Sequence, residues 1–133
     1  MSQENVEIVR EHFEATNRGD YAFAVGQYAD DVELVLPPGD LLSGTYSGRE
    51  AVSGFFADWF RAFGGSQHFD LREIRDVGDA VVVVARHEAR GRRSGAAISG
   101  EFFYSYWLSD GKIRRVLFHA SRDDALDAVG LRE

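Results

Sequence analysis

Three stretches in the C-terminal half of the chain alternate between apolar and polar side chains, at residues 81–92, 98–108 and 112–120. A period of two residues is typical of a β-strand with one buried face. Short polar turns that contain glycine join them, Arg93-Ser94-Gly95 and Ser109-Asp110-Gly111, and such turns favour β-hairpins. The pattern predicts a meander of three long antiparallel strands, one face of which must be buried.

Apolar residues at helical spacing precede these strands. Residues 4–17 repeat apolar positions at intervals of three and four, which predicts an amphipathic helix. Asp20 is expected to cap a second helix over residues 21–29. The motif SGRE at residues 47–50 has the form of a capping box and predicts a third helix, which Gly64-Gly65 ends. The positions expected to be buried are Val6, Val9, Phe13 and Thr16; Ala24, Val25 and Tyr28; and Val52, Phe55, Phe56, Trp59, Phe60 and Phe63.

Two further strands and a closing helix complete the predicted elements. Residues 32–36 alternate as a short strand that two prolines end, and a loop rich in glycine and serine follows over residues 39–46. Residues 68–76 form a strand with imperfect alternation, and the capping motif SRDD at residues 121–124 begins the last helix. This order predicts the α+β class, as a cone-shaped α+β roll. Its curved, mostly antiparallel sheet has three N-terminal helices over one face, with a short C-terminal helix.

Composition and charge narrow the function. The 133 residues are 44% hydrophobic and 28% charged, which predicts a single globular domain over residues 1–133. No stretch reaches the roughly 18 apolar residues of a membrane span, and the N-terminus lacks the pattern of a signal peptide. The lack of cysteine favours a cytoplasmic location. A net charge of −7 disfavours nucleic acid as a partner, and we interpret the basic cluster Arg86, Arg90, Arg92 and Arg93 as a solvated or dimer-facing surface.

Charge also distinguishes the two faces of the meander. Five charged residues fall on the same face, and they are Arg86, Glu88, Arg90, Glu101 and Arg115. The other face carries His87, Tyr104 and Phe118, because side chains alternate along a strand. We therefore expect the helices to cover the face with His87, Tyr104 and Phe118.

A pocket is expected on this covered face. Its predicted walls, the candidate ligand-binding residues, are Tyr28, Phe56, Trp59, Phe102, Tyr106 and Phe118. Its polar groups, the candidate catalytic residues, are His87, Tyr104 and His12. An aromatic pocket with few polar groups is typical of sites for small apolar molecules. Neutral His87 is suited to accept a proton near pH 7, and Tyr104 is suited to donate to a ligand oxygen. Each polar residue also has a purely structural interpretation, as a buried group that needs a hydrogen-bond partner.

The order of elements and four local motifs resemble the NTF2-like superfamily, and within it the SnoaL-like domains. The motifs are NRGD at residues 17–20, YADDVE at 28–33, GREAV at 48–52 and DGKI at 110–113. The resemblance covers nearly the whole chain and implies the cone fold. It implies no single activity, because ketosteroid isomerases, limonene epoxide hydrolases, polyketide cyclases and plain binding modules share this fold.

The catalytic residues of these relatives are mostly missing. Ketosteroid isomerases of the superfamily have an aspartate base where this chain has Leu36 or Pro37. Their oxyanion hole aligns with His12 and Tyr104, so hydrogen-bond donors are kept while the base is lost.

The epoxide hydrolases carry an aspartate–arginine–aspartate set that aligns with His87, Ala85 and Phe118. The cyclases carry an acidic residue on the last strand, near Phe118. The resemblance therefore implies that each of these known catalytic sets lacks an essential residue in this chain.

The charged face of the meander has its own apolar cluster. Phe103, Trp107 and Leu117 lie among charges there, a pattern typical of a protein–protein interface. We predict a homodimer through these residues; the alternative is a loop that covers Trp107. The four histidines lack metal-ligand spacing and no cofactor motif is present, so neither a metal nor a cofactor is expected.

Three functional hypotheses follow. The first is a binding module that holds a small hydrophobic, oxygen-bearing molecule without turnover. The second is an isomerase, cyclase or hydrolase that acts on a polyketide- or terpenoid-like substrate, with His87 as base and Tyr104 and His12 as hydrogen-bond donors. The third is a dimerisation unit. The missing carboxylates favour the first hypothesis, while the three polar groups of the expected pocket are consistent with the second.

Overall fold

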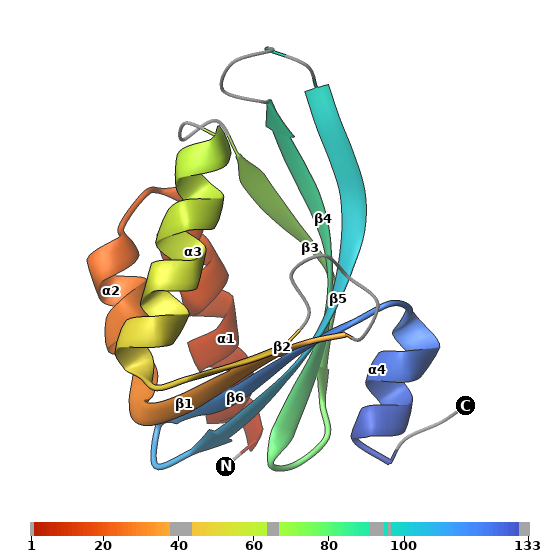
Figure 1. Ribbon diagram of the computed structural model, residues 1–133. Helices are drawn as coiled ribbons and strands as arrows, with labels where there is room; N and C mark the ends of the chain where they lie inside the picture. Colours follow the sequence, from red (N-terminus) through yellow and green to blue (C-terminus); the bar gives the residue numbers. More distant parts are fainter. Residues whose placement is uncertain (1, 38–43, 64–66, 91–94, 96, 131–133) are drawn as a thin grey trace.

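The computed structural model describes residues 2–37, 44–63, 67–90, 95 and 97–130, and ten helices and strands lie within them (Figure 1). In chain order they are α1 (Ser2–Asn17), α2 (Tyr21–Gly26), β1 (Tyr28–Leu36), β2 (Gly44–Ser47), α3 (Arg49–Phe63), β3 (His68–Asp76), β4 (Ala80–Arg90), β5 (Ala97–Ser109), β6 (Lys112–His119) and α4 (Arg122–Ala128). The predicted α+β class is confirmed.

One curved sheet contains all six strands, in the order β2-β1-β6-β5-β4-β3. The predicted meander β4-β5-β6 is antiparallel throughout, while β1 runs parallel to β6. Figure 1 shows α1, α2 and α3 on one side of this sheet and α4 on the other. We call the two sides the helix-covered face and the outer face.

The main core lies between the helix-covered face and the helices. It contains Val9 and Phe13 of α1, Val52 of α3 and the inward residues Val83 and Tyr104 of the sheet. Because β-branched and aromatic side chains fill this layer, the amphipathic helices bury their apolar stripes against it. The expectation that His87, Tyr104 and Phe118 share the covered face is confirmed: His87 is 2% exposed and Tyr104 is 4% exposed, and Phe118 packs against the same core.

The predicted boundary between α2 and β1 is wrong. The second helix ends at Gly26, and β1 begins at Tyr28 instead of residue 32. Tertiary hydrogen bonds explain the change: the Arg49 guanidinium donates to the Tyr28 carbonyl at 2.7 Å, and the Ile113 amide donates to the Gln27 carbonyl at 2.9 Å. Both partners are far away in sequence, so local propensity does not reveal them.

The region after β1 contains a strand that the sequence pattern missed. Residues 44–47 form β2, antiparallel to β1, where a loop was expected. Ser47 pairs with Glu33 in this ladder, so the predicted capping box does not form and α3 begins at Arg49. Gly48 precedes the helix with φ of +93°, a conformation that favours glycine.

The imperfect alternation of residues 68–76 has a structural cause. The register of β3 against β4 shifts between Leu71 and Glu73, and such an irregularity changes the face on which later side chains lie. The predicted caps of α2 and α4 are confirmed, since Asp20 accepts from the Phe23 amide and Ser121 accepts from the Asp124 amide.

Several predicted features lie outside the described residues. They are most of the loop at 39–46, the glycine pair at 64–65, the end of the strand at residues 91–92, and Arg93 and Ser94 of the turn that follows it. In the part of the chain that is described, no helix combines the length and apolar character that crossing a membrane requires.

Candidate functional site

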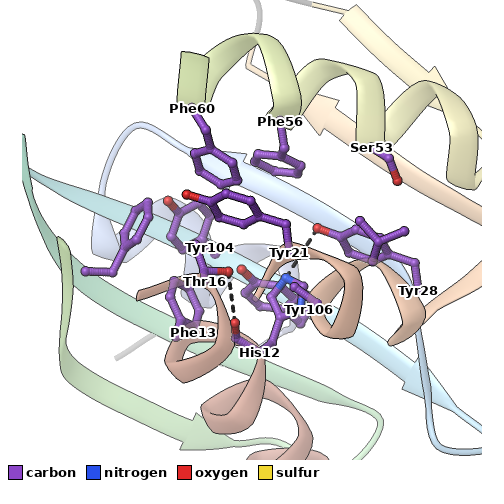
Figure 2. A pocket seen from close by; sticks show the side chains of 13 residues that line it. His12, Phe13, Thr16, Tyr21, Tyr28, Ser53, Phe56, Phe60, Tyr104 and Tyr106 are labelled. Carbon is purple, nitrogen blue, oxygen red and sulfur yellow. Dashed lines mark hydrogen bonds between the residues drawn. The ribbon is translucent and has the colours of Figure 1, made fainter. Parts of the chain in front are cut away.

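A cavity of about 50 Å³ lies under the helices, against the middle of β5 (Figure 2). Its lining residues are His12, Phe13, Thr16, Tyr21, Ala24, Val25, Tyr28, Ser53, Phe56, Phe60, Phe69, Tyr104 and Tyr106. The volume has room for a few water molecules. It is well below the roughly 300–1,000 Å³ of ligand pockets for drug-sized molecules.

The structure brings five of the predicted site residues together in this cavity. They are His12, Tyr28, Phe56, Tyr104 and Tyr106. The other predicted residues, His87, Trp59, Phe102 and Phe118, lie outside its lining. Their rings pack on one another instead: His87 stacks on Phe102 with ring centroids 5.1 Å apart, and Trp59 lies 5.7 Å from Phe102.

Sequence reasoning missed several lining residues. Phe13 and Thr16 belong to the predicted buried stripe of α1, so a signal for them was present in the pattern. Tyr21, Ser53 and Phe69 had no such signal, because their place at the cavity depends on how α2, α3 and β3 approach one another.

A chain of hydrogen bonds fixes the protonation of His12. The Gln27 side-chain amide donates from Nε2 to the Ile8 carbonyl at 3.1 Å, so its Oε1 faces His12. Because a carbonyl oxygen only accepts, the His12 Nδ1 at 2.9 Å must carry the ring proton. In the neutral ring Nε2 is then an acceptor, and the Tyr28 hydroxyl donates to it at 3.3 Å (Figure 2).

Burial determines the charge state of the cavity groups. It lowers the pKa of His12 to about 4, although the hydrogen bonds of the ring to Gln27 and to the backbone of Ala24 act in the opposite direction. Burial also raises the pKa of Tyr28, Tyr104 and Tyr106 above the ordinary value for tyrosine. Near pH 7 the imidazole is therefore neutral and the three phenols keep their protons.

Three hydroxyls at the cavity have no hydrogen-bond partner among the described residues. Tyr104 and Tyr106 make ring contacts only, and their rings lie 5.8 Å apart. The Ser53 hydroxyl on α3 is buried and also unpaired within the described part of the chain. A buried hydroxyl without a partner costs about 1–3 kcal/mol, and this cost applies to Ser53 Oγ. All three hydroxyls are free to donate to a ligand that supplies hydrogen-bond acceptors.

The surroundings of His87 differ from those of the cavity. Its Nε2 lies 3.1 Å from Gln67 Oε1 and forms a hydrogen bond with that side chain. Phe69 lies between the two regions, because its ring lines the cavity and packs 4.7 Å from the His87 ring. Burial lowers the pKa of His87, so this imidazole is neutral near pH 7.

On the outer face the predicted dimer residues have different neighbours. Phe103 packs under α4 with Val82 and Leu126. Trp107 is partly buried, with the Arg115 guanidinium 5.6 Å from its ring centre. Leu117 lines a groove of about 390 Å³ beside the end of β1. The C-terminal helix covers the part of this face around Phe103.

A serine–histidine pair also lies on the outer face. Ser105 Oγ and His119 Nε2 are 2.8 Å apart, but Ser105 is completely buried under α4. A hydroxyl that no substrate can reach does not act as a nucleophile. Ser105 Oγ instead donates to the Ala125 carbonyl at 3.4 Å and so links the sheet to α4. Within the described residues, no group of three or more histidine, aspartate or glutamate side chains is placed to hold a metal ion.

The curved sheet, the three helices over one face and the aromatic cavity between them define a cone-shaped α+β domain. The family model described as SnoaL-like domain matches residues 9–116, and the chain belongs to this family. The resemblance to the NTF2-like superfamily is thereby confirmed, and SnoaL-like proteins form a small-molecule-binding family.

Individual relatives agree with this assignment. An uncharacterized protein of Mycobacterium tuberculosis is 27% identical over 112 residues, 84% of this chain and 85% of the relative. TerC, solved with polyporic acid, is 24% identical with a TM-score of 0.76 over 95% of this chain and 98% of its own. An NTF2-like protein of unknown function from Burkholderia pseudomallei is 22% identical with a TM-score of 0.78, over 98% and 99% of the two chains.

Proposed function

We propose that this protein binds a small, uncharged, mostly apolar molecule that carries oxygen, in the cavity between the helices and β5. The observation that carries the proposal is the chemistry of the lining. The described lining residues are aromatic, aliphatic or neutral polar, and none is a carboxylate, lysine or arginine. Such a site favours an apolar ligand, because an ion buried there has no countercharge.

The relative TerC supports an organic ligand. That relative was crystallised with polyporic acid and has the same fold over nearly its whole length. We extend to this chain only the general idea of an organic ligand held in the cone.

Binding without turnover is the preferred form of the proposal. The pKa of His12, about 4, makes it a weak base. The raised pKa values of the tyrosines keep them as donors and prevent them from acting as bases. Leu36 and Pro37, where related isomerases carry an aspartate, have no proton-accepting side chain.

The test is a fluorescence titration with N-phenyl-1-naphthylamine, an uncharged apolar probe. Ala24 lines the cavity and Ala22 of the same helix is exposed, so the same substitution at the two positions is a matched pair. We expect Ala24→Phe to fill the cavity and reduce probe affinity at least tenfold, and Ala22→Phe to leave it unchanged.

Overpacking costs about 1–3 kcal/mol, so thermal unfolding must show that Ala24→Phe is folded. Val25→Phe, at another lining position, replaces it if it is not. Failure of the wild type to bind, or equal binding by the filled variants, would contradict the proposal.

Turnover with His87 as base stays the alternative. Its test is a screen of ketosteroid, lactone and epoxide substrates with the wild type and His87→Ala. We expect no turnover. If the wild type turns a substrate over and His87→Ala does not, the proposal of binding without turnover is wrong and catalysis through His87 takes its place. If turnover survives the substitution, the mechanism through His87 is excluded.

We also propose a homodimer through the outer face, where Phe103, Trp107 and Leu117 lie. The partly buried Trp107 and Leu117 support it, since α4 leaves them incompletely covered. Gel filtration of Trp107→Glu should give a monomer. Phe23→Glu, at an exposed position on α2, is the control and should remain a dimer; a dimeric Trp107→Glu variant would show that another face is used.

A further inference from the structure

Two aliphatic hydroxyl side chains, a threonine and a serine, reach the cavity from helices, and their hydrogen bonding differs. Thr16 on α1 donates to the His12 carbonyl one turn earlier, at 2.9 Å, as hydroxyls inside helices commonly do. Ser53 on α3 lines the same cavity with a buried Oγ, but has no hydrogen-bond partner among the described residues. Thr16 is therefore satisfied by its own helix, and Ser53 is not.

The neighbours of Ser53 do not use its proton either. In Figure 2 its side chain points from α3 toward the cavity, at the end where Tyr28 lies. Among the described lining residues, the one imidazole acceptor is His12 Nε2, and the Tyr28 hydroxyl already donates to it. A donor thus remains at this end of the cavity after the described side chains have been paired.

We propose that Ser53 Oγ is a ligand-binding group that donates a hydrogen bond to an uncharged acceptor oxygen, such as a carbonyl. This proposal rests on the proposed function of the cavity and adds a polar contact on α3 to it. An uncharged oxygen fits because the described lining has no cation to pair with an anionic one. Ser53 then selects among apolar ligands of similar shape by their oxygen.

The experiment compares 9-fluorenone with fluorene, two flat molecules of similar shape that differ by one carbonyl. Affinities are measured by displacement of N-phenyl-1-naphthylamine from the wild type, Ser53→Ala and Thr16→Val. We expect the wild type to prefer fluorenone about five- to tenfold, the effect of one neutral hydrogen bond. Ser53→Ala should lose this preference and bind fluorene as the wild type does. Thr16→Val removes a satisfied hydroxyl of the same cavity and should keep the preference.

The outcomes separate this proposal from the one on which it rests. No binding of any probe to the wild type contradicts the proposed function and, with it, the role of Ser53. Two outcomes overturn the role of Ser53 alone. Either the wild type binds both molecules with no preference for fluorenone, or the preference persists in Ser53→Ala. Ser53→Ala should fold, because it removes an unpaired buried hydroxyl and places a strong helix former in α3.

Discussion

His12 shows how burial sets the chemistry of a single side chain in this protein. The ring is 7% exposed, and its two nitrogens are committed to Gln27 and Tyr28. A charged imidazole would lose hydration there, and Nε2 would change from acceptor to donor against a hydroxyl that already donates to it. The folded protein therefore resists protonation of His12, with consequences for its stability in acid.

We predict that this histidine makes the fold labile in mild acid. In the unfolded chain His12 takes up a proton below about pH 6.5, whereas in the folded protein it does so only below about pH 4. The free energy of unfolding should therefore fall as the pH drops from 6.5 to 4, by about 3 kcal/mol from this residue alone. Urea unfolding of the wild type and of His12→Asn across this range measures the difference.

In the His12→Asn variant, the asparagine side chain keeps a hydrogen-bond donor toward Gln27 but does not titrate. Its pH dependence should be weaker than that of the wild type, although the lowered pKa values of His87 and His119 add a dependence of the same sign in both proteins. Exposed His68 offers the control substitution His68→Asn. If the free energy of unfolding depends on pH in the same way in the wild type and in His12→Asn, the prediction is contradicted.

At the scale of elements, the end of α1 is fastened to the edge of the sheet. The Asn17 side-chain amide donates to the Phe69 carbonyl and accepts from the Phe69 amide, both at 2.8 Å. This pair satisfies both backbone groups of one residue on β3, an edge strand. It also places Phe69 where its ring separates the cavity from the His87 cluster.

We predict that Asn17→Ala lowers the free energy of unfolding by about 2 kcal/mol, because it leaves two partly buried backbone groups unpaired. Glu14→Ala, at an exposed position of the same helix, is the control and should change it by less than about 0.5 kcal/mol. Chemical denaturation measures both variants. A loss of similar size in the two would mean that the Asn17 amide does not fasten α1.

For the whole molecule, the size of the cavity implies that helices or side chains must move when a ligand enters. At about 50 Å³ the cavity is smaller than the ligands proposed for it. Tyr21 of α2 and Phe60 of α3 both line it, and their rings stack with centroids 4.8 Å apart. Tyr21 is 36% exposed, so this stack lies between the cavity and the solvent.

We predict that Tyr21→Ala speeds the association of N-phenyl-1-naphthylamine several-fold, because it removes one ring of the stack. Phe23 is the other exposed aromatic residue of α2 and does not line the cavity in the described structure. Phe23→Ala should therefore leave the association rate unchanged in stopped-flow fluorescence. Equal acceleration by both substitutions would point to general loosening of α2, and no acceleration would place the entrance elsewhere.

Features that depend on neighbours along the chain could be predicted from the amino-acid sequence. Periodicity gave α1, the meander β4-β5-β6 and the face on which His87 and Tyr104 lie, because two- and 3.6-residue repeats decide which side chains can be buried together. Capping chemistry gave the starts of α2 and α4 at Asp20 and Ser121. These local rules were enough for the fold class.

Which inward residues meet at the cavity depends on the packing of helices against the sheet, and the sequence pattern did not reveal it. His87 faces inward as expected, yet Phe69 and Phe102 pack on its ring, while Ser53 and Tyr21 reach the cavity from helices. The early start of β1 likewise depends on Arg49, 21 residues further along the chain. Where helices pack on a sheet is set by the shapes of both surfaces together, and the period of one element carries no information about the other.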